Sequence, residues 1–118
     1  MGCNSTSGIT LVKGPPVLTA SERASIIESC KWVQECLHDT PYTATEQTLD
    51  EYNCKYYIHG DDPCYGEDGY DICARLAERG RFKLIKRTTG VSTTDITGRL
   101  LRLVSSDSIP VSVKEAPQ

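Results

Sequence analysis

The sequence predicts an α/β protein built on a parallel sheet, because short apolar segments alternate along the chain with helix-forming ones. Three observations carry this prediction. A capping box at Thr19 and Glu22 opens a helix, apolar residues recur at helical spacing near residue 100, and apolar runs of strand length lie between the helices. A chain of 118 residues can bury a modest core, so we expect one domain or a piece of one.

The expected elements follow in order from the N-terminus. The capping box predicts a helix over 19–29, and the apolar segment 32–37 then predicts a buried strand. A turn at 39–42 precedes a short helix at 45–52 and a strand at 56–59.

The second half of the chain continues this alternation after a polar loop at 60–69. A helix is expected at 71–79, with Gly80 in the position just past its end, where a left-handed backbone is common. The segment 82–85 predicts the next strand, and 93–104 predicts the last helix. Its apolar stripe consists of Ile96, Leu100, Leu101 and Val104.

Charge and hydropathy exclude several functions. The formal net charge of −3 argues against a general binder of nucleic acid or membrane surfaces, and no run of about eighteen apolar residues could cross a bilayer. Without a secretory signal, we expect a cytoplasmic protein. Positive charge is concentrated in one stretch, at Arg75, Arg79, Arg81, Lys83, Lys86 and Arg87, which suits a small polyanion.

The six cysteines form no C-x-x-C pair, and no histidine stands at ligand spacing from them. We therefore expect reduced thiols and no metal ion held by protein side chains.

A basic, hydroxyl-rich turn at 86–95 links the strand at 82–85 to the last helix. Gly90 allows a tight turn, Ser92 is a good N-cap with Asp95 three residues on, and the first amides of a helix favour negative charge. Lys86 and Arg87 would add full positive charges there. The turn therefore suits a phosphate group, although an ordinary capped helix start has the same local pattern.

The motifs of this chain resemble those of the nucleotidyltransferase-fold cytidylyltransferases. The run at 87–95 fills every position of that family's R-T-x-G-[IV]-S-T-[ST]-D signature. Lys13-Gly14, Tyr42 after Pro41, and His59-Gly60-Asp61 follow in the family's order, and the match extends over about 2–104. The resemblance implies a Rossmann-like fold with a parallel sheet.

The resemblance also implies that this chain is incomplete. The family's H-x-G-H motif is absent, since His38 and His59 are the only histidines. We expect 1–104 to be a partial catalytic domain lacking its first strand and helix, and 105–118 to be a flexible C-terminal tail. The chain alone is then expected to be weakly active or inactive.

The resemblance implies transfer of a cytidylyl group from CTP, with Mg²⁺, to a phosphomonoester. It assigns catalytic roles to Lys13, His59 and Arg87, and substrate binding to Tyr42, His59 and Asp61. It assigns nucleotide binding to Lys31, Arg87, Thr88, Gly90, Val91, Ser92, Thr93 and Thr94. Simpler roles stay open: Lys13 as a solvated loop residue, His59 as a structural hydrogen-bonding group and Tyr42 as a core aromatic.

The details of the motifs favour the ethanolamine-phosphate branch of the family over the choline-phosphate branch. G-V-S-T-T-D and His-Gly-Asp-Asp are closer to the former, so we expect phosphoethanolamine as the acceptor, with phosphocholine as the alternative. The segment of Lys31 implies a homodimer contact, although Gln34 replaces the usual aspartate.

Two further readings remain open. The chain could be a non-catalytic isoform that binds nucleotide or pairs with a full-length subunit. The start M-G-x-x-x-[ST] also allows acylation and an anchored adaptor.

Overall fold

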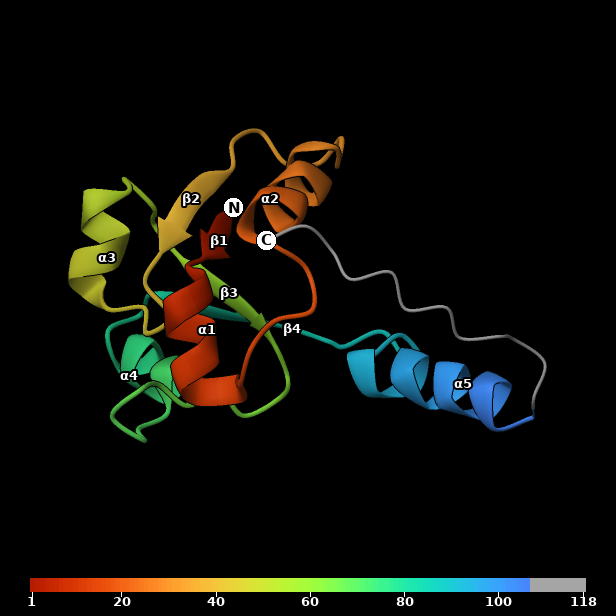
Figure 1. Ribbon diagram of the computed structural model, residues 1–118. Helices are drawn as coiled ribbons and strands as arrows, with labels where there is room; N and C mark the ends of the chain where they lie inside the picture. The colour runs from red at the N-terminus through yellow and green to blue at the C-terminus, as the bar shows by residue number, and fades with distance from the viewer. Residues whose placement is uncertain (107–118) are drawn as a thin grey trace. The chain divides into compact units, whose positions relative to one another are not determined.

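The computed structural model describes residues 1–106, which divide into two compact units, Met1–Lys86 and the chain from Arg87 onward (Figure 1). The order of elements in the described part is β1, α1, α2, β2, α3, β3, α4, β4 and α5. Strands and helices alternate except that α1 and α2 follow each other, so the predicted α/β class is confirmed.

The chain begins with the strand β1 (Gly2–Asn4) and the helix α1 (Thr6–Lys13). Ser5 caps α1, since its hydroxyl accepts a hydrogen bond of 3.1 Å from the amide of Gly8. The elements expected from sequence patterns begin at residue 19, so those patterns did not predict α1, whose start depends on the Ser5 cap.

The helix α2 (Ala20–Glu28) begins at the predicted capping box. The amide of Thr19 donates to the Glu22 carboxylate at 2.8 Å, and the amide of Glu22 donates to the Thr19 hydroxyl at 3.2 Å. This reciprocal cap joins residues only three positions apart, which explains why the helix start could be predicted from sequence.

The buried strand predicted at 32–37 is wrong. A turn continues from the end of α2, with the amide of Val33 donating to the carbonyl of Cys30 at 3.0 Å, and Trp32 is 82% exposed. The strand β2 (Leu37–Thr40) starts where the prediction ended and overlaps the predicted turn at 39–42. It pairs in parallel with β1, with Gly2 opposite Leu37, and this distant partner decides its position.

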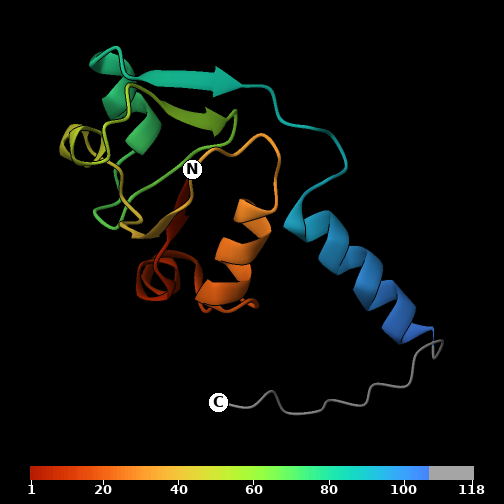
Figure 2. The same cartoon turned by 90° about the horizontal axis from the view of Figure 1, so that it is seen from above.

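The remaining elements of the first unit lie within two residues of their predicted bounds. They are α3 (Glu46–Glu51), β3 (Tyr57–Gly60), α4 (Ile72–Glu78) and β4 (Phe82–Ile85). β3 and β4 pair in parallel and run side by side in Figure 2 as the green and teal arrows. In the described residues the parallel strands form two separate pairs, β1 with β2 and β3 with β4.

The core of the first unit lies under β3 and β4. Leu49, Ile72 and Leu76 are buried together, and Tyr57 and Phe82 of the two strands pack against them. α4 therefore ties β3 to β4 through its apolar face, while Gly80 ends the connection with φ +68°.

In the second unit, α5 (Thr93–Ser105) starts at the predicted N-cap Ser92. Its predicted apolar stripe is present in the sequence, but none of the residues of α5 is buried. The helix includes Ser105, the first residue of the predicted tail, and residues 107–118 lie outside the described part. Within residues 1–106, no helix is long and apolar enough to cross a membrane.

Candidate phosphate-binding site and its family

The carboxyl ends of β3 and β4 lie at the same edge of their sheet. His59 stands opposite Leu84, and Gly60 stands opposite Ile85, in the parallel register. The loop starting at Asp61 and the residue Lys86 therefore both follow directly from this edge. Ligands of open α/β sheets bind outside the carboxyl ends of the strands, so this edge is where a substrate site is expected.

His59 is half-buried and held from two sides. Its Nδ1 atom lies 3.0 Å from the carbonyl oxygen of Gly60, and its ring stacks on that of Tyr57 with 6.2 Å between the centroids. Because a carbonyl oxygen only accepts hydrogen bonds, this contact requires a proton on Nδ1. These two contacts hold the ring in place and engage Nδ1.

Lys13 is the last residue of α1, where a positive charge is favourable near the carbonyl end of a helix. Gly14 then reverses the chain with φ +85°. The alternative of a loop lysine is therefore wrong in its secondary structure, although the side chain is exposed.

Tyr42 follows β2 and is half-buried against α1. A Cβ atom at Gly8 would lie 3.2 Å from the Cβ of Tyr42, so the helix backbone and this residue are closely packed. The close approach involves only the Cβ atom of Tyr42, and this residue does not pack against the core cluster of Leu49, Ile72 and Leu76.

Lys31 lies in the turn after α2. Its Nζ atom is 4.9 Å from the ring centroid of Trp32, and both side chains are exposed. A cation over an exposed indole is stabilised by about 0.5–1 kcal/mol. This contact therefore restrains the two side chains within an otherwise solvent-exposed turn.

The second unit holds the basic turn. Gly90 has φ +78°, as its predicted role in a tight turn requires. The hydroxyl of Ser92 accepts from the amide of Asp95 at 3.0 Å, and the Asp95 carboxylate accepts from the amide and hydroxyl of Ser92. These bonds, together with the charge of Arg87, hold the pKa of Asp95 below its usual range.

The structure brings the predicted residues together in two groups only. Ser92, Asp95 and Arg87 interact in the turn of the second unit, and His59 shares the strand edge with Asp61 and Lys86 in the first. Lys13, Lys31, Tyr42 and His59 lie on different elements, and no hydrogen bond or ion pair links any two of these four described residues.

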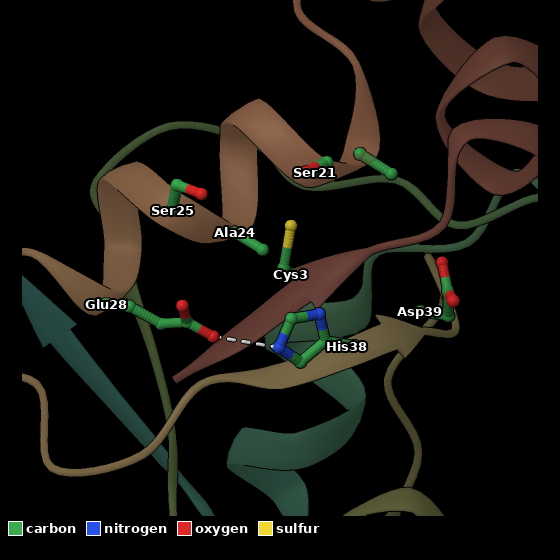
Figure 3. Close-up of a pocket in the computed structure, with 8 residues that line it drawn as sticks. Cys3, Ser21, Ala24, Ser25, Glu28, His38 and Asp39 are labelled. Carbon is green, nitrogen blue, oxygen red and sulfur yellow. Dashed lines mark hydrogen bonds and ion pairs between the residues drawn. The ribbon is translucent and has the colours of Figure 1, made fainter.

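A pocket of about 370 Å³ lies between α2, β1 and β2, and none of the predicted site residues lines it (Figure 3). Glu28 and His38 line it and are joined by a bond of 2.9 Å from Nε2 to Oε1, and Cys36 completes a cluster with them. Partial burial, the Glu28 charge and Cys3 raise the pKa of the Cys36 thiol. Sequence spacing missed this cluster, although the run Cys36-Leu37-His38 places two ligand types close together.

A second group of polar side chains lies against the core. Burial raises the pKa of Cys73 from 9.0 to about 11, with added effects of Cys64 and Asp71. Burial also raises the pKa of the Tyr57 hydroxyl, which lies 3.9 Å from the Cys64 sulfur. All six cysteines are free thiols, and burial favours the protonated form of the Cys73 thiol and of the Tyr57 hydroxyl.

The parallel strand pairs, the loops at their carboxyl ends and the capped basic turn define a nucleotidyltransferase-like α/β protein. The chain matches the cytidylyltransferase-like family over residues 3–99 and belongs to that family.

Named relatives agree with this membership. The ethanolamine-phosphate cytidylyltransferase of Arabidopsis thaliana is 47% identical over 113 residues, covering 92% of this chain and 27% of the relative. The mouse protein of the same name is 42% identical over 101 residues, covering 86% of this chain and 25% of the relative. The choline-phosphate cytidylyltransferase of Saccharomyces cerevisiae is 36% identical over 91 residues, covering 77% and 22%. The chain thus spans about a quarter of the length of these relatives.

Proposed function

We propose that this chain contributes the acceptor edge and the phosphate-binding turn to a CTP:phosphoethanolamine cytidylyltransferase. The observation that carries the proposal is the edge of β3 and β4, where His59 and Gly60 lie beside Leu84 and Ile85 and the basic turn follows immediately in the chain. The match to the family over residues 3–99 supports the same assignment.

The proposed reaction forms a bond from a phosphoethanolamine oxygen to the α-phosphorus of CTP and breaks the bond to the leaving pyrophosphate. A phosphate dianion is already nucleophilic, so no side chain needs to remove a proton, and Asp61 serves to orient neighbouring groups. Catalysis then depends on positive charge and fixed donors around the phosphates.

His59, Lys13 and Arg87 are the proposed catalytic residues among those that supply these charges and donors. His59 directs Nε2 to the acceptor phosphate, because Nδ1 is engaged by Gly60. Lys13 and Arg87 neutralise the phosphates of CTP, and Arg87 acts with the backbone and hydroxyls at 88–94. Lys31 lies along the nucleotide, and Tyr42 contacts the acceptor. Losing one such donor costs about 3 kcal/mol of transition-state stabilisation in other enzymes.

Mg²⁺ is proposed to enter with CTP, held by the triphosphate. The one three-residue cluster of potential ligands in residues 1–106 contains a thiol and an imidazole, whereas Mg²⁺ prefers oxygen ligands. No step of the reaction is therefore assigned to a protein-held magnesium ion.

Phosphoethanolamine is the proposed acceptor, with phosphocholine as the competing one. Relatives of both names match this chain, at 47% and 42% identity for two ethanolamine-phosphate enzymes and 36% for a choline-phosphate enzyme. A primary ammonium can donate three hydrogen bonds and a quaternary one cannot, so a polar acceptor pocket would separate them.

A chimera tests the proposal directly. The chain replaces the matching 27% of the Arabidopsis thaliana relative, and pyrophosphate release is measured with CTP, Mg²⁺ and either acceptor. The 118-residue chain alone is measured beside it. We expect turnover by the chimera with phosphoethanolamine preferred, and little or none by the chain alone.

The other outcomes are equally informative. A folded but inactive chimera would contradict the proposed function and favour a non-catalytic partner that binds nucleotide or a longer subunit. Preference for phosphocholine would reassign the branch. Equal turnover by the chain alone would show that no H-x-G-H motif is needed. The proposal includes a cytoplasmic location, which cell fractionation tests. It also includes a homodimer, which light scattering tests.

A further inference from the structure

The pocket between α2, β1 and β2 has no role in the proposed cytidylyl transfer. Two of the residues that line it, Glu28 and His38, form a cluster with Cys36, which lies outside the lining. The cluster combines a carboxylate, an imidazole and a thiol. Their ligand atoms all lie within 4.8 Å of one another. In Figure 3 the Glu28 and His38 side chains point toward each other from α2 and β2, and Cys3 of β1 points toward α2 beside them.

We propose that Glu28, Cys36 and His38 form a binding site for a zinc ion. Zinc takes thiolate sulfur, imidazole nitrogen and carboxylate oxygen, at about 2.0–2.3 Å, in a tetrahedral arrangement. Ligand atoms around one such ion are about 3.3–3.8 Å apart. A pair separated by up to 4.8 Å therefore has to close by about 1–1.5 Å, and the Glu28–His38 pair at 2.9 Å has to open by about 0.5 Å. Because Glu28 and His38 are about half-exposed, their side chains can rotate by that amount.

Two of the three ligand atoms are already in contact. Nε2 of His38 and Oε1 of Glu28 are 2.9 Å apart, and the ion replaces the proton that they share. On binding, the imidazole proton moves to Nδ1, the Cys36 thiol releases its proton to water, and the S–Zn bond forms. One thiolate and one carboxylate then balance the two charges of the ion.

The donor set selects the metal. Mg²⁺ and Ca²⁺ prefer oxygen ligands, whereas a site with sulfur, nitrogen and oxygen favours zinc. Cys3 lines the same pocket but lies outside the group of three, so the fourth position is left to water. Bound zinc would fasten the last turn of α2 to β2, both in the first unit.

The test is calorimetric titration of the full chain with Zn²⁺ alone, under a reductant that does not bind zinc, with Mg²⁺ as the comparison ion. Cys36→Ser, His38→Gln and Glu28→Gln each remove one ligand from an exposed or half-buried position. Cys30→Ser is the matched control, because Cys30 is an exposed thiol near the end of α2 and outside the cluster. Circular dichroism of the metal-free variants verifies that each is folded.

We expect one zinc per chain, no heat from Mg²⁺, and at least about a tenfold loss of zinc affinity in each ligand variant but not in Cys30→Ser. Co²⁺ in place of Zn²⁺ should show a thiolate-to-metal absorption that Cys36→Ser abolishes. The proposal is overturned if the folded chain binds no zinc, if Cys36→Ser binds as tightly as the parent, or if Cys30→Ser loses as much affinity. Since none of these readouts involves CTP, they are independent of the proposed function.

Discussion

His59 and Leu84 stand opposite each other in the parallel register of β3 and β4, one residue before both strands end. This pairing fixes where the loop at Asp61 and the basic turn after Lys86 leave the sheet. The Nδ1 contact of His59 with Gly60 at 3.0 Å holds the ring at that edge, and the proposed roles of the neighbouring residues depend on this arrangement.

Replacing His59 tests the acceptor edge. In the chimera, His59→Asn should lower kcat about 10²- to 10³-fold, the range found when one fixed donor is lost from a developing charge. Ile58→Val is the control, because successive strand residues point to opposite faces and Ile58 is exposed. Steady-state pyrophosphate release measures both, and equal rates for the two variants would refute the role of His59.

Replacing Arg87 tests the basic turn. Arg87→Ala in the chimera should reduce kcat/KM for CTP by about 10²-fold or more, because one charge beside the phosphates is lost. Arg99→Ala removes the same charge later in α5 and should leave the kinetics unchanged. Initial rates at varied CTP give both parameters. A similar loss in both variants would point to net charge and not to a specific contact.

The core of the first unit depends on Ile72, which is 1% exposed beneath β3 and β4. Ile72→Ala should lower the free energy of unfolding by about 2–5 kcal/mol, through lost burial and the cavity left behind. Ile26→Ala makes the same deletion at a side chain that is 60% exposed and should change stability by less than about 0.5 kcal/mol. Urea unfolding followed by circular dichroism compares them.

Arg81 ties the end of α3 to the start of β3. Its guanidinium donates to Asp50 at 2.6 Å and to the carbonyls of Cys54 and Lys55 at 2.7 and 3.2 Å, and its side chain is only 21% exposed. Arg81→Ala should cost about 1.5–3 kcal/mol, since three hydrogen bonds from a charged donor are lost, one of them to the part-buried carbonyl of Cys54. Arg79→Ala breaks a 3.5 Å pair at a side chain 68% exposed and should cost about 0–1 kcal/mol. Comparable losses would contradict this distinction.

The raised pKa of Cys73, about 11, predicts slow alkylation. At pH 8 its thiolate fraction is about a hundredfold lower than that of a thiol at the usual 9.0, and the thiolate is the reactive form. Because the folded pKa exceeds the unfolded one, the stability from this thiol is complete below about pH 9 and is lost as pH rises through 11. Mass spectrometry after iodoacetamide at pH 8 should show Cys30 modified well before Cys73; equal rates would contradict the prediction.

Local hydrogen bonding explains which parts of the fold were predictable. The caps at Thr19 and Ser92 each join residues three positions apart, so the helix starts of α2 and α5 follow from short sequence patterns. Gly80 follows the end of α4 with a positive φ, which glycine adopts readily, so this helix end also depends on a local property of the chain. The signature at 87–95 was recognisable from its resemblance to the family's motif, and the roles of its residues in catalysis stay predictions.

The sequence by itself determined the α/β class, most helix starts, the β3 and β4 strands and the family. Only the tertiary structure decided that β2 starts at Leu37, because its hydrogen bonds come from β1 at the other end of a long connection. It also decided that Glu28, Cys36 and His38 meet, since that contact needs a helix end and a strand to be brought together. Helix caps join residues three positions apart and can be predicted from short sequence patterns. Strand pairing and side-chain clusters depend on residues far apart in the sequence, which become neighbours only when the chain folds.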